Sequence, residues 1–165
     1  MMPEARIAAP VEIHEAVRLA RELYGLEISA DRLPGEYDDN FHLTVGDGRA
    51  YVLKVMYPSR ESSFLDLQCG ALQHLAQRAP QLSLPRVCHT RDNQAFQTAT
   101  LADGSIRLVW MLTYVPGKVL AEARPHSVEL LESLGRFLGE IDAMLQDFSH
   151  PAAHRELKGD LSRAG

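Results

Sequence analysis

The sequence predicts an α+β fold in which an antiparallel sheet of about five strands packs against a helix. Two turn signals, Gly46-Asp47-Gly48 and Ala102-Asp103-Gly104, each join two short segments of strand-like composition. Glycines in such turns accept the positive φ that a tight hairpin needs. Apolar residues recur at helical spacing over 10–24, 60–79 and 127–148, which predicts three amphipathic helices that cover the sheet.

The predicted elements follow one another in a simple order. The first helix runs from Pro10 to Tyr24, with proline near its start and Gly25 as its stop. Ser59 is the expected N-cap of the second helix, over 60–79. The expected strands are 28–33, 41–45, 50–55, 94–101 and 105–115, and residues 86–89 are a further short candidate. Pro116-Gly117 ends the sheet, and the third helix follows it.

Composition and charge exclude several classes of protein. The 165 residues carry a formal net charge of −5, which argues against nucleic acid as a partner because proteins that bind the phosphate backbone usually show a basic surplus. No apolar run approaches the roughly 18 residues of a membrane span, and the first residues lack the apolar core of a signal peptide. Cys69 and Cys88 lack metal-ligand spacing and are expected to be buried in a reducing environment. We therefore expect a cytoplasmic protein.

Lys54 is the first candidate for a functional residue, because its neighbours in the strand Tyr51-Val52-Leu53-Lys54-Val55 are apolar. Burying an unpaired ammonium costs free energy, so such a lysine usually has an anionic partner or reaches the rim of the sheet. In a nucleotide-binding lobe that partner is a phosphate together with an acidic helix residue. A solvent-facing lysine on an edge strand is the competing interpretation, and the strand alone leaves both open.

Two further segments add to Lys54. The turn from Gly35 to Phe41 lacks any known phosphate-loop motif and carries three acidic residues, so an ordinary acidic hairpin competes with a phosphate-facing turn. The strand from Met111 to Gly117 ends in Pro-Gly and exposes backbone donors and acceptors, with which an adenine edge can pair while Val52 and Met111 sandwich the ring. A loop, a strand lysine and a hinge in this order are what a kinase-type nucleotide lobe needs.

Taken together, these segments resemble the N-terminal part of the aminoglycoside phosphotransferase-like kinases, which are related to choline kinases and protein kinases. Within these, the chain is most similar to the hydroxylysine-kinase type, including the kinase domain fused to class III aminotransferases. The resemblance rests on 35–41, 51–54, Leu65-Asp66-Leu67-Gln68 with Ala71-Leu72, 112–118, and 134–151. It implies a protein kinase-like N-terminal lobe over 27–117, preceded by a helical segment over 1–26 and followed by the start of the C-terminal lobe over 118–165.

The resemblance also implies roles for individual residues. Lys54 holds the α- and β-phosphates of ATP, and Asp39, Asn40 and Phe41 belong to the loop over the triphosphate. The backbone of Thr113 and Val115 pairs with adenine. Gln68 stands where many relatives have a glutamate that pairs with the lysine, and a neutral amide fixes an ammonium less strongly.

The catalytic machinery of the family is not expected in this chain. These kinases use a loop of the form H-G-D-x-x-x-x-N and a later aspartate that together bind Mg²⁺ and orient the acceptor hydroxyl. Lys158-Gly159-Asp160-Leu161 imitates that loop but lacks the histidine and the asparagine, so Asp160 is not expected to be catalytic, and the metal ligands are expected elsewhere. The resemblance implies transfer of the ATP γ-phosphate to a small hydroxyl-bearing amine by the intact enzyme. A non-catalytic nucleotide-binding or regulatory module, fused to or partnering an aminotransferase, is the alternative.

Overall fold

The computed structural model describes residues 8–154. Its centre is a six-stranded antiparallel sheet with the order β1-β2-β3-β6-β4, and β5 also pairs with β6. The strands are β1 (Ile28–Leu33), β2 (Asp39–Val45), β3 (Ala50–Val55), β4 (Val87–Cys88), β5 (Phe96–Thr100) and β6 (Ile106–Thr113). The predicted meander and second hairpin are confirmed. The sheet has six strands instead of about five because β4, only two residues long, pairs with Met111 and Leu112 of β6.

Three helices accompany the sheet: α1 (Ile13–Tyr24), α2 (Ser62–Arg78) and α3 (Val128–Leu145). Gly25 ends α1 with φ 68°, the left-handed conformation that glycine adopts without a steric penalty. The predicted cap of α2 is wrong, because Glu61 and not Ser59 occupies the N-cap position and its side chain forms no capping hydrogen bond. Two short 3₁₀ turns, η1 (Leu120–Glu122) and η2 (Pro151–Ala153), lie on either side of α3.

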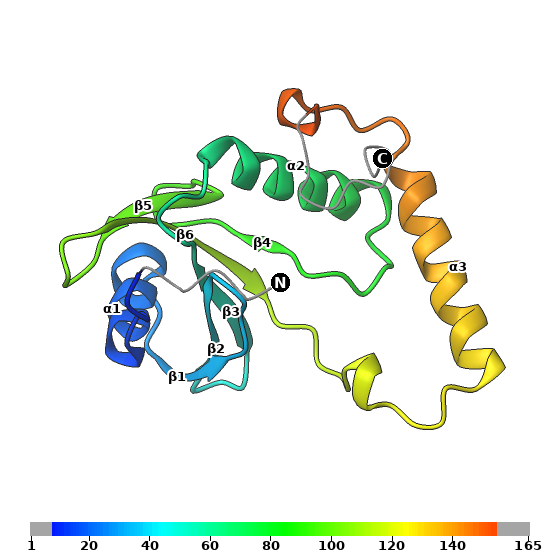
Figure 1. Cartoon of the computed structure of the whole chain (residues 1–165), viewed down its shortest axis with the longest axis horizontal. Helices are drawn as coiled ribbons and strands as arrows, with labels where there is room; N and C mark the ends of the chain where they lie inside the picture. The colour runs from blue at the N-terminus through cyan, green and yellow to red at the C-terminus, as the bar shows by residue number, and fades with distance from the viewer. Residues whose placement is uncertain (1–7, 155–165) are drawn as a thin grey trace, which may run out of the picture.

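The two long faces of the sheet are covered by different helices. Figure 1 shows α1 on one side of the strands and α2 on the other. Alternate residues of the strands therefore enter two separate apolar cores. The α1 core is built on Phe41, Leu43, Leu53, Val55, Val109 and Met111, packed against Ala16, Leu19 and Ala20. The α2 core contains Met56, Trp110 and Leu112, packed against Leu65 and Cys69.

The segment after the sheet contacts α2 through the side chains of Arg78 and His74. In Figure 1, α3 runs beyond α2 and away from the sheet. None of the α3 residues is buried in the described part of the chain, and Val128, Leu131 and Leu138 are 66%, 50% and 51% exposed. At the C-terminal end, Arg78 of α2 forms an ion pair of 2.9 Å with Asp147. α3 thus has an apolar stripe, formed by Val128, Leu131 and Leu138, that the rest of residues 8–154 leaves uncovered. No helix among residues 8–154 is both long and apolar enough to cross a membrane.

Candidate functional site

The candidate site is built on the side of β3 that faces away from α1. Successive side chains of a strand point to opposite faces, so Leu53 and Val55 enter the α1 core while Val52 and Lys54 face the other way. The strand register places Asn40 and His42 of β2 beside Lys54 and Val52, and Trp110 and Leu112 of β6 on their other side. We name this set the Lys54 face; its members are Asn40, His42, Val52, Lys54, Trp110 and Leu112.

Lys54 lies on an interior strand, since β3 pairs with β2 and β6. The interpretation of Lys54 as an edge-strand lysine is therefore wrong. Its Nζ lies 5.7 Å from the centroid of the Trp110 ring, and among residues 8–154 no Asp or Glu forms an ion pair with it. A tryptophan face compensates an ammonium only in part. The half-buried cation is thus placed to accept an anion from outside the sheet.

The turn before β2 is held tightly by one side chain. Asn40 Nδ2 donates to the carbonyl oxygen of Pro34 at 3.1 Å. A Cβ on Gly35 would lie 2.3 Å from the Asp38 carbonyl oxygen and 2.6 Å from Asn40 Nδ2, so only glycine fits there without a shift of the turn. Asn40 Oδ1 is buried and has no hydrogen-bond partner among the described residues. Because Asn40 pairs with Lys54 in the register, the closed turn lies directly beside the lysine.

Two of the three acidic side chains of this turn, those of Asp38 and Asp39, are engaged elsewhere. Asp38 Oδ1 accepts a hydrogen bond of 2.8 Å from the backbone N–H of Tyr57. Asp39 is 2% exposed and forms a 2.9 Å ion pair with Arg32 on the α1 side. Phe41 is fully buried in the α1 core. The side chains of Asp39 and Phe41 therefore do not face Lys54, and only their backbone remains for the predicted role in a loop over phosphates.

The expected hinge follows β6. Thr113 donates its backbone N–H to the Arg86 carbonyl at 2.9 Å, and the N–H of Arg86 returns to the Thr113 hydroxyl Oγ1 at 2.9 Å. The backbone N–H of Arg86 therefore donates to the Thr113 hydroxyl and leaves the Thr113 carbonyl oxygen unoccupied by this donor. Tyr114 N–H donates to the Ala50 carbonyl at 3.0 Å and ties the hinge to β3. Val115 lies beyond the end of β6 and is partly exposed.

The expected pairing of Val52 with Met111 around one ring is not found. Met111 is 2% exposed and belongs to the α1 core, whereas Val52 lies on the Lys54 face. Leu112 is the β6 residue that pairs with Val52. The sequence alone gave no register between the two strands, and a shift of one residue exchanges the faces.

His42, Trp110 and Leu112 are the members of the Lys54 face that sequence reasoning missed, and His42 is the polar one. Its ring lies edge-on to the Tyr114 ring, with 4.4 Å between centroids and 74° between planes. This contact joins β2 to the hinge across the end of β3. The alternation of buried residues at Phe41 and Leu43 was the signal that would have placed His42 on the opposite face.

Gln68 does not fix Lys54 in this structure. It is half-buried on α2, next to Cys69 in the α2 core, and among residues 8–154 no hydrogen bond joins it to Lys54. Asp66, two positions earlier, faces His150 at 3.2 Å and does not replace the missing carboxylate. The lysine thus has no helix partner here.

The two thiols, Cys69 in the α2 core and Cys88 against the α1 core, give no sign of a nucleophile. Burial raises the pKa of the Cys69 thiol to about 12 and that of Cys88 to about 11. Both thiols are free, and Cys88 is only partly buried, which departs from the expectation. Among residues 8–154 no group of three His, Cys, Asp or Glu side chains is placed to hold a metal ion. Asp160 lies outside the described residues.

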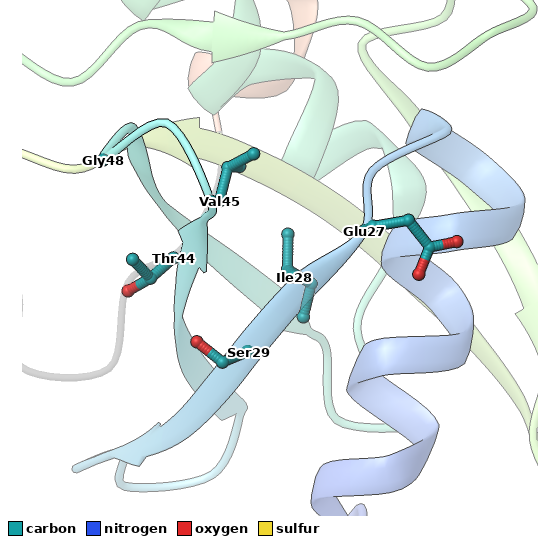
Figure 2. A pocket seen from close by; sticks show the side chains of 7 residues that line it. Glu27, Ile28, Ser29, Thr44, Val45 and Gly48 are labelled. Atoms are coloured by element: carbon teal, nitrogen blue, oxygen red, sulfur yellow. The ribbon is translucent and has the colours of Figure 1, made fainter.

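A separate hollow occurs at the far end of the β2–β3 hairpin. Its volume is about 580 Å³, and Figure 2 shows it between the start of β1 and the turn at Gly48. Lining residues include Glu27, Ser29 and Thr44, and none of them is cationic. Thr44 pairs with Ala50, at the opposite end of the ladder from Asn40 and Lys54. The lining of this hollow has no positive charge to hold a phosphate, and the hollow is not part of the Lys54 face.

Comparison with known proteins adds a family match and similar sequences. Residues 29–164 match the phosphotransferase enzyme family. A hydroxylysine kinase of Mus musculus is 29% identical over 158 residues, covering 86% of this chain and 41% of that protein. A hydroxylysine kinase of Danio rerio is 32% identical over 139 residues, covering 81% of the chain and 38% of the relative. The chain thus spans about two fifths of the length of these relatives.

Two solved structures share the fold. Amicoumacin kinase, solved in complex with AMP-PNP and Ca²⁺, superposes with a TM-score of 0.71 and 17% identity, covering 84% of this chain and 41% of that one. A microcompartment-associated aminopropanol kinase superposes with a TM-score of 0.69 and 18% identity, covering 90% and 45%. The sheet with its helices is therefore a kinase-like N-terminal lobe.

Proposed function

The chain belongs to the phosphotransferase enzyme family, and we propose that it forms the ATP-binding lobe of a cytoplasmic small-molecule kinase. The observation that carries the proposal is Lys54, a half-buried cation on an interior strand with no carboxylate partner among the described residues. The intact enzyme transfers the γ-phosphate of ATP, with Mg²⁺, to the hydroxyl of a small amine or amino alcohol.

The residues around Lys54 fit a nucleotide. The ammonium supplies a counter-charge for the α- and β-phosphates, and the turn closed by Asn40 over Gly35 brings backbone N–H groups beside it. Asp38 and Asp39 have partners of their own, so their carboxylates do not oppose a phosphate. At the other end of the face, the backbone of Thr113 and Val115 pairs with the adenine edge, and Val52 with Leu112 contacts the ring.

Phosphoryl transfer of this kind depends on positioning and charge stabilisation. Bound Mg²⁺ supplies neutralisation of the β- and γ-phosphate charge. Lys54 holds the phosphates in line, and the Asn40 turn excludes water from one side. The acceptor class follows from the relatives, since the names hydroxylysine kinase and aminopropanol kinase denote kinases of compounds that carry both an amine and a hydroxyl.

The direct test is calorimetric titration of MgATP into the complete protein with Lys54 intact and with Lys54→Ala. We expect the variant to bind at least about tenfold more weakly, because one charge-assisted contact is worth about 1.5–3 kcal/mol. Arg49→Ala, which removes a cation from the exposed β2–β3 turn, is the matched control and should bind as the wild type does. Equal affinity of Lys54→Ala and wild type rules out the role of Lys54.

A non-catalytic nucleotide-binding module, fused to or partnering an aminotransferase, is the second candidate. Gln68 favours it, because the lysine lacks the helix carboxylate that completes a kinase clamp. Both candidates predict that residues 1–165 alone transfer no phosphate, since they contain no H-G-D-x-x-x-x-N loop. Turnover above background with an amino alcohol and MgATP contradicts that expectation. Transfer by the complete protein separates the kinase from the regulatory module.

A further inference from the structure

A second polar pocket lies where β3 ends and the chain turns into α2. Its volume is about 260 Å³, and Arg60, Ser62, Thr98 and Arg107 line it together with Tyr57 and three apolar residues. Lys54 is not among the lining residues, and neither is any Asp or Glu among the described ones. The lining has two cationic side chains and three that carry a hydroxyl group, a composition that suits an anion.

Arg107 is the most unusual of these residues. Its side chain is less than 2% exposed, the largest fully buried side chain of the described structure. Nε donates to Ser105 Oγ at 3.1 Å and Nη1 to the Met56 carbonyl at 3.3 Å. Both acceptors are neutral, and no carboxylate within residues 8–154 forms an ion pair with Arg107. A buried guanidinium whose hydrogen-bond acceptors are neutral is costly, and no hydrogen bond within residues 8–154 occupies Nη2.

Arg60 and the start of α2 add positive potential. Arg60 Nε lies 3.4 Å from Asp38 Oδ1, and the guanidinium carbon lies 5.9 Å from the centroids of the Tyr37 and Phe64 rings. No hydrogen bond within residues 8–154 occupies the two terminal nitrogens of Arg60, which remain for another acceptor. The N-cap residue Glu61 makes no capping hydrogen bond, and the first turn of this 17-residue helix contains no acidic residue. The N–H groups of Ser62 and Ser63 thus stay uncapped at the positive end of the helix dipole.

The carboxylates of this neighbourhood are held by other groups. Asp38 accepts from the Tyr57 N–H at 2.8 Å. Asp103 accepts from the N–H and hydroxyl of Ser105 at 2.9 and 2.6 Å. Glu61 lies 3.4 Å from Ser63 Oγ. Asp103 interacts electrostatically with Arg107, and the hydrogen-bonded path between the two passes through the Ser105 hydroxyl. The residues that line the pocket include no Asp or Glu.

The geometry points to a binding site for a phosphate group in this pocket, separate from the nucleotide site on the Lys54 face. Guanidinium groups bind oxyanions through parallel N–H donors, and an uncapped helix N-terminus adds backbone donors. The ligand is inorganic phosphate or the phosphoryl group of a small monoester. An anion in this pocket would contact Ser62 at the start of α2 and Arg107 on β6, and would thereby link that helix to the strand. Gln68 lies on the same helix. The inference does not depend on the proposed kinase function.

The test is a titration of the chain with inorganic phosphate at constant ionic strength, followed by ¹⁵N–¹H NMR with sodium chloride as the reference. We expect saturable shifts of the Ser62, Ser63 and Thr98 amides. Arg60→Gln should weaken the binding at least fivefold, whereas Arg49→Gln should leave it unchanged. Lys54→Ala should also leave it unchanged, which separates this pocket from the nucleotide site. A parallel titration with glycerol 3-phosphate distinguishes the free ion from a monoester.

Several outcomes overturn the inference. Non-saturable shifts, or shifts equal to those with chloride, mean that no phosphate site exists in the pocket. Saturable shifts confined to Asn40 and Lys54 assign the phosphate to the nucleotide site instead. Ser62→Glu places a carboxylate at the pocket and should abolish phosphate binding. Ser62→Ala should weaken phosphate binding only slightly. Equal phosphate binding by the two variants also contradicts the proposal. Folding of each variant is checked in the same spectra.

Discussion

The two faces of the central strands differ sharply although they are made from alternating residues of the same strands. On the α1 face, Phe41, Leu43, Leu53 and Val55 are completely buried. On the Lys54 face, Asn40, His42, Val52 and Lys54 are each only partly buried. On the first face the one acid of β2, Asp39, is paired with Arg32. On the second face, within residues 8–154, the Lys54 ammonium has no carboxylate partner and the Asn40 amide oxygen has no hydrogen-bond partner.

This difference separates stability from binding within one sheet. The α1 face stabilises the lobe through close packing, in which even one methylene matters. The Lys54 face leaves polar groups without protein partners, a state that native structures retain mainly where a ligand or a catalytic role accounts for it. Substitutions on neighbouring positions of one strand should therefore have very different consequences.

The largest expected effect compares Leu53→Ala with Val52→Ala. Leu53 is fully buried in the α1 core, and its truncation should lower the free energy of unfolding by about 2–5 kcal/mol. Val52 is partly exposed on the Lys54 face, and its truncation should cost no more than about 1 kcal/mol. Urea denaturation monitored by circular dichroism measures both. Equal losses in the two variants would break the distinction between the faces.

A smaller effect is expected for Gly35→Ala in the turn beside Lys54. The added Cβ meets the Asp38 carbonyl at 2.3 Å, so the turn must open at a cost of about 1–3 kcal/mol. Gly46→Ala is the matched control, because a Cβ there meets nothing within 4 Å. We expect MgATP affinity to fall in the first variant and to stay unchanged in the second. A Gly35→Ala protein with wild-type affinity and stability would show that the turn does not need its closed form.

The smallest effect concerns the two thiols and pH. The pKa of Cys69 is raised to about 12 and that of Cys88 to about 11, against about 8.5 in an unfolded chain. Their contribution to stability is therefore complete below pH 8 and decreases as the pH rises through 9 towards the folded values. Between pH 7 and 9 the two thiols together should lower the free energy of unfolding by about 1.5 kcal/mol.

Urea denaturation at both pH values, with the wild type and with a variant carrying Cys69→Ala and Cys88→Ala, measures this contribution. The variant should lose less stability over that interval. A larger loss in the variant would contradict buried, protonated thiols. Slow alkylation of Cys69 in the folded protein is a second expected result, because the thiolate is the reactive form.

Local patterns in the sequence predicted much of this lobe. Glycine turns and apolar spacing are properties of neighbouring residues, so the hairpins, α1 and α2 were predicted to within a few residues. The cap of α2 was wrong because Ser59 and Glu61 both precede the helix, and only the path of the connection decides which residue takes the N-cap position. The kinase family was identified from the order of its motifs, and the family match over 29–164 agrees with it.

The sequence by itself determined the elements and the family, because these depend on local propensity and motif order, whereas the interior position of the Lys54 strand came from the sheet topology. Only the tertiary structure decided the register between strands that are distant in sequence. That register puts Met111 on the α1 face, Leu112 beside Val52, and His42 against Tyr114. The tertiary structure also shows that the Asp39 side chain points towards Arg32 and that Arg107 is buried beside the start of α2. Side-chain direction follows from which strands pair and at which residues, and those pairings arise from packing of the whole lobe.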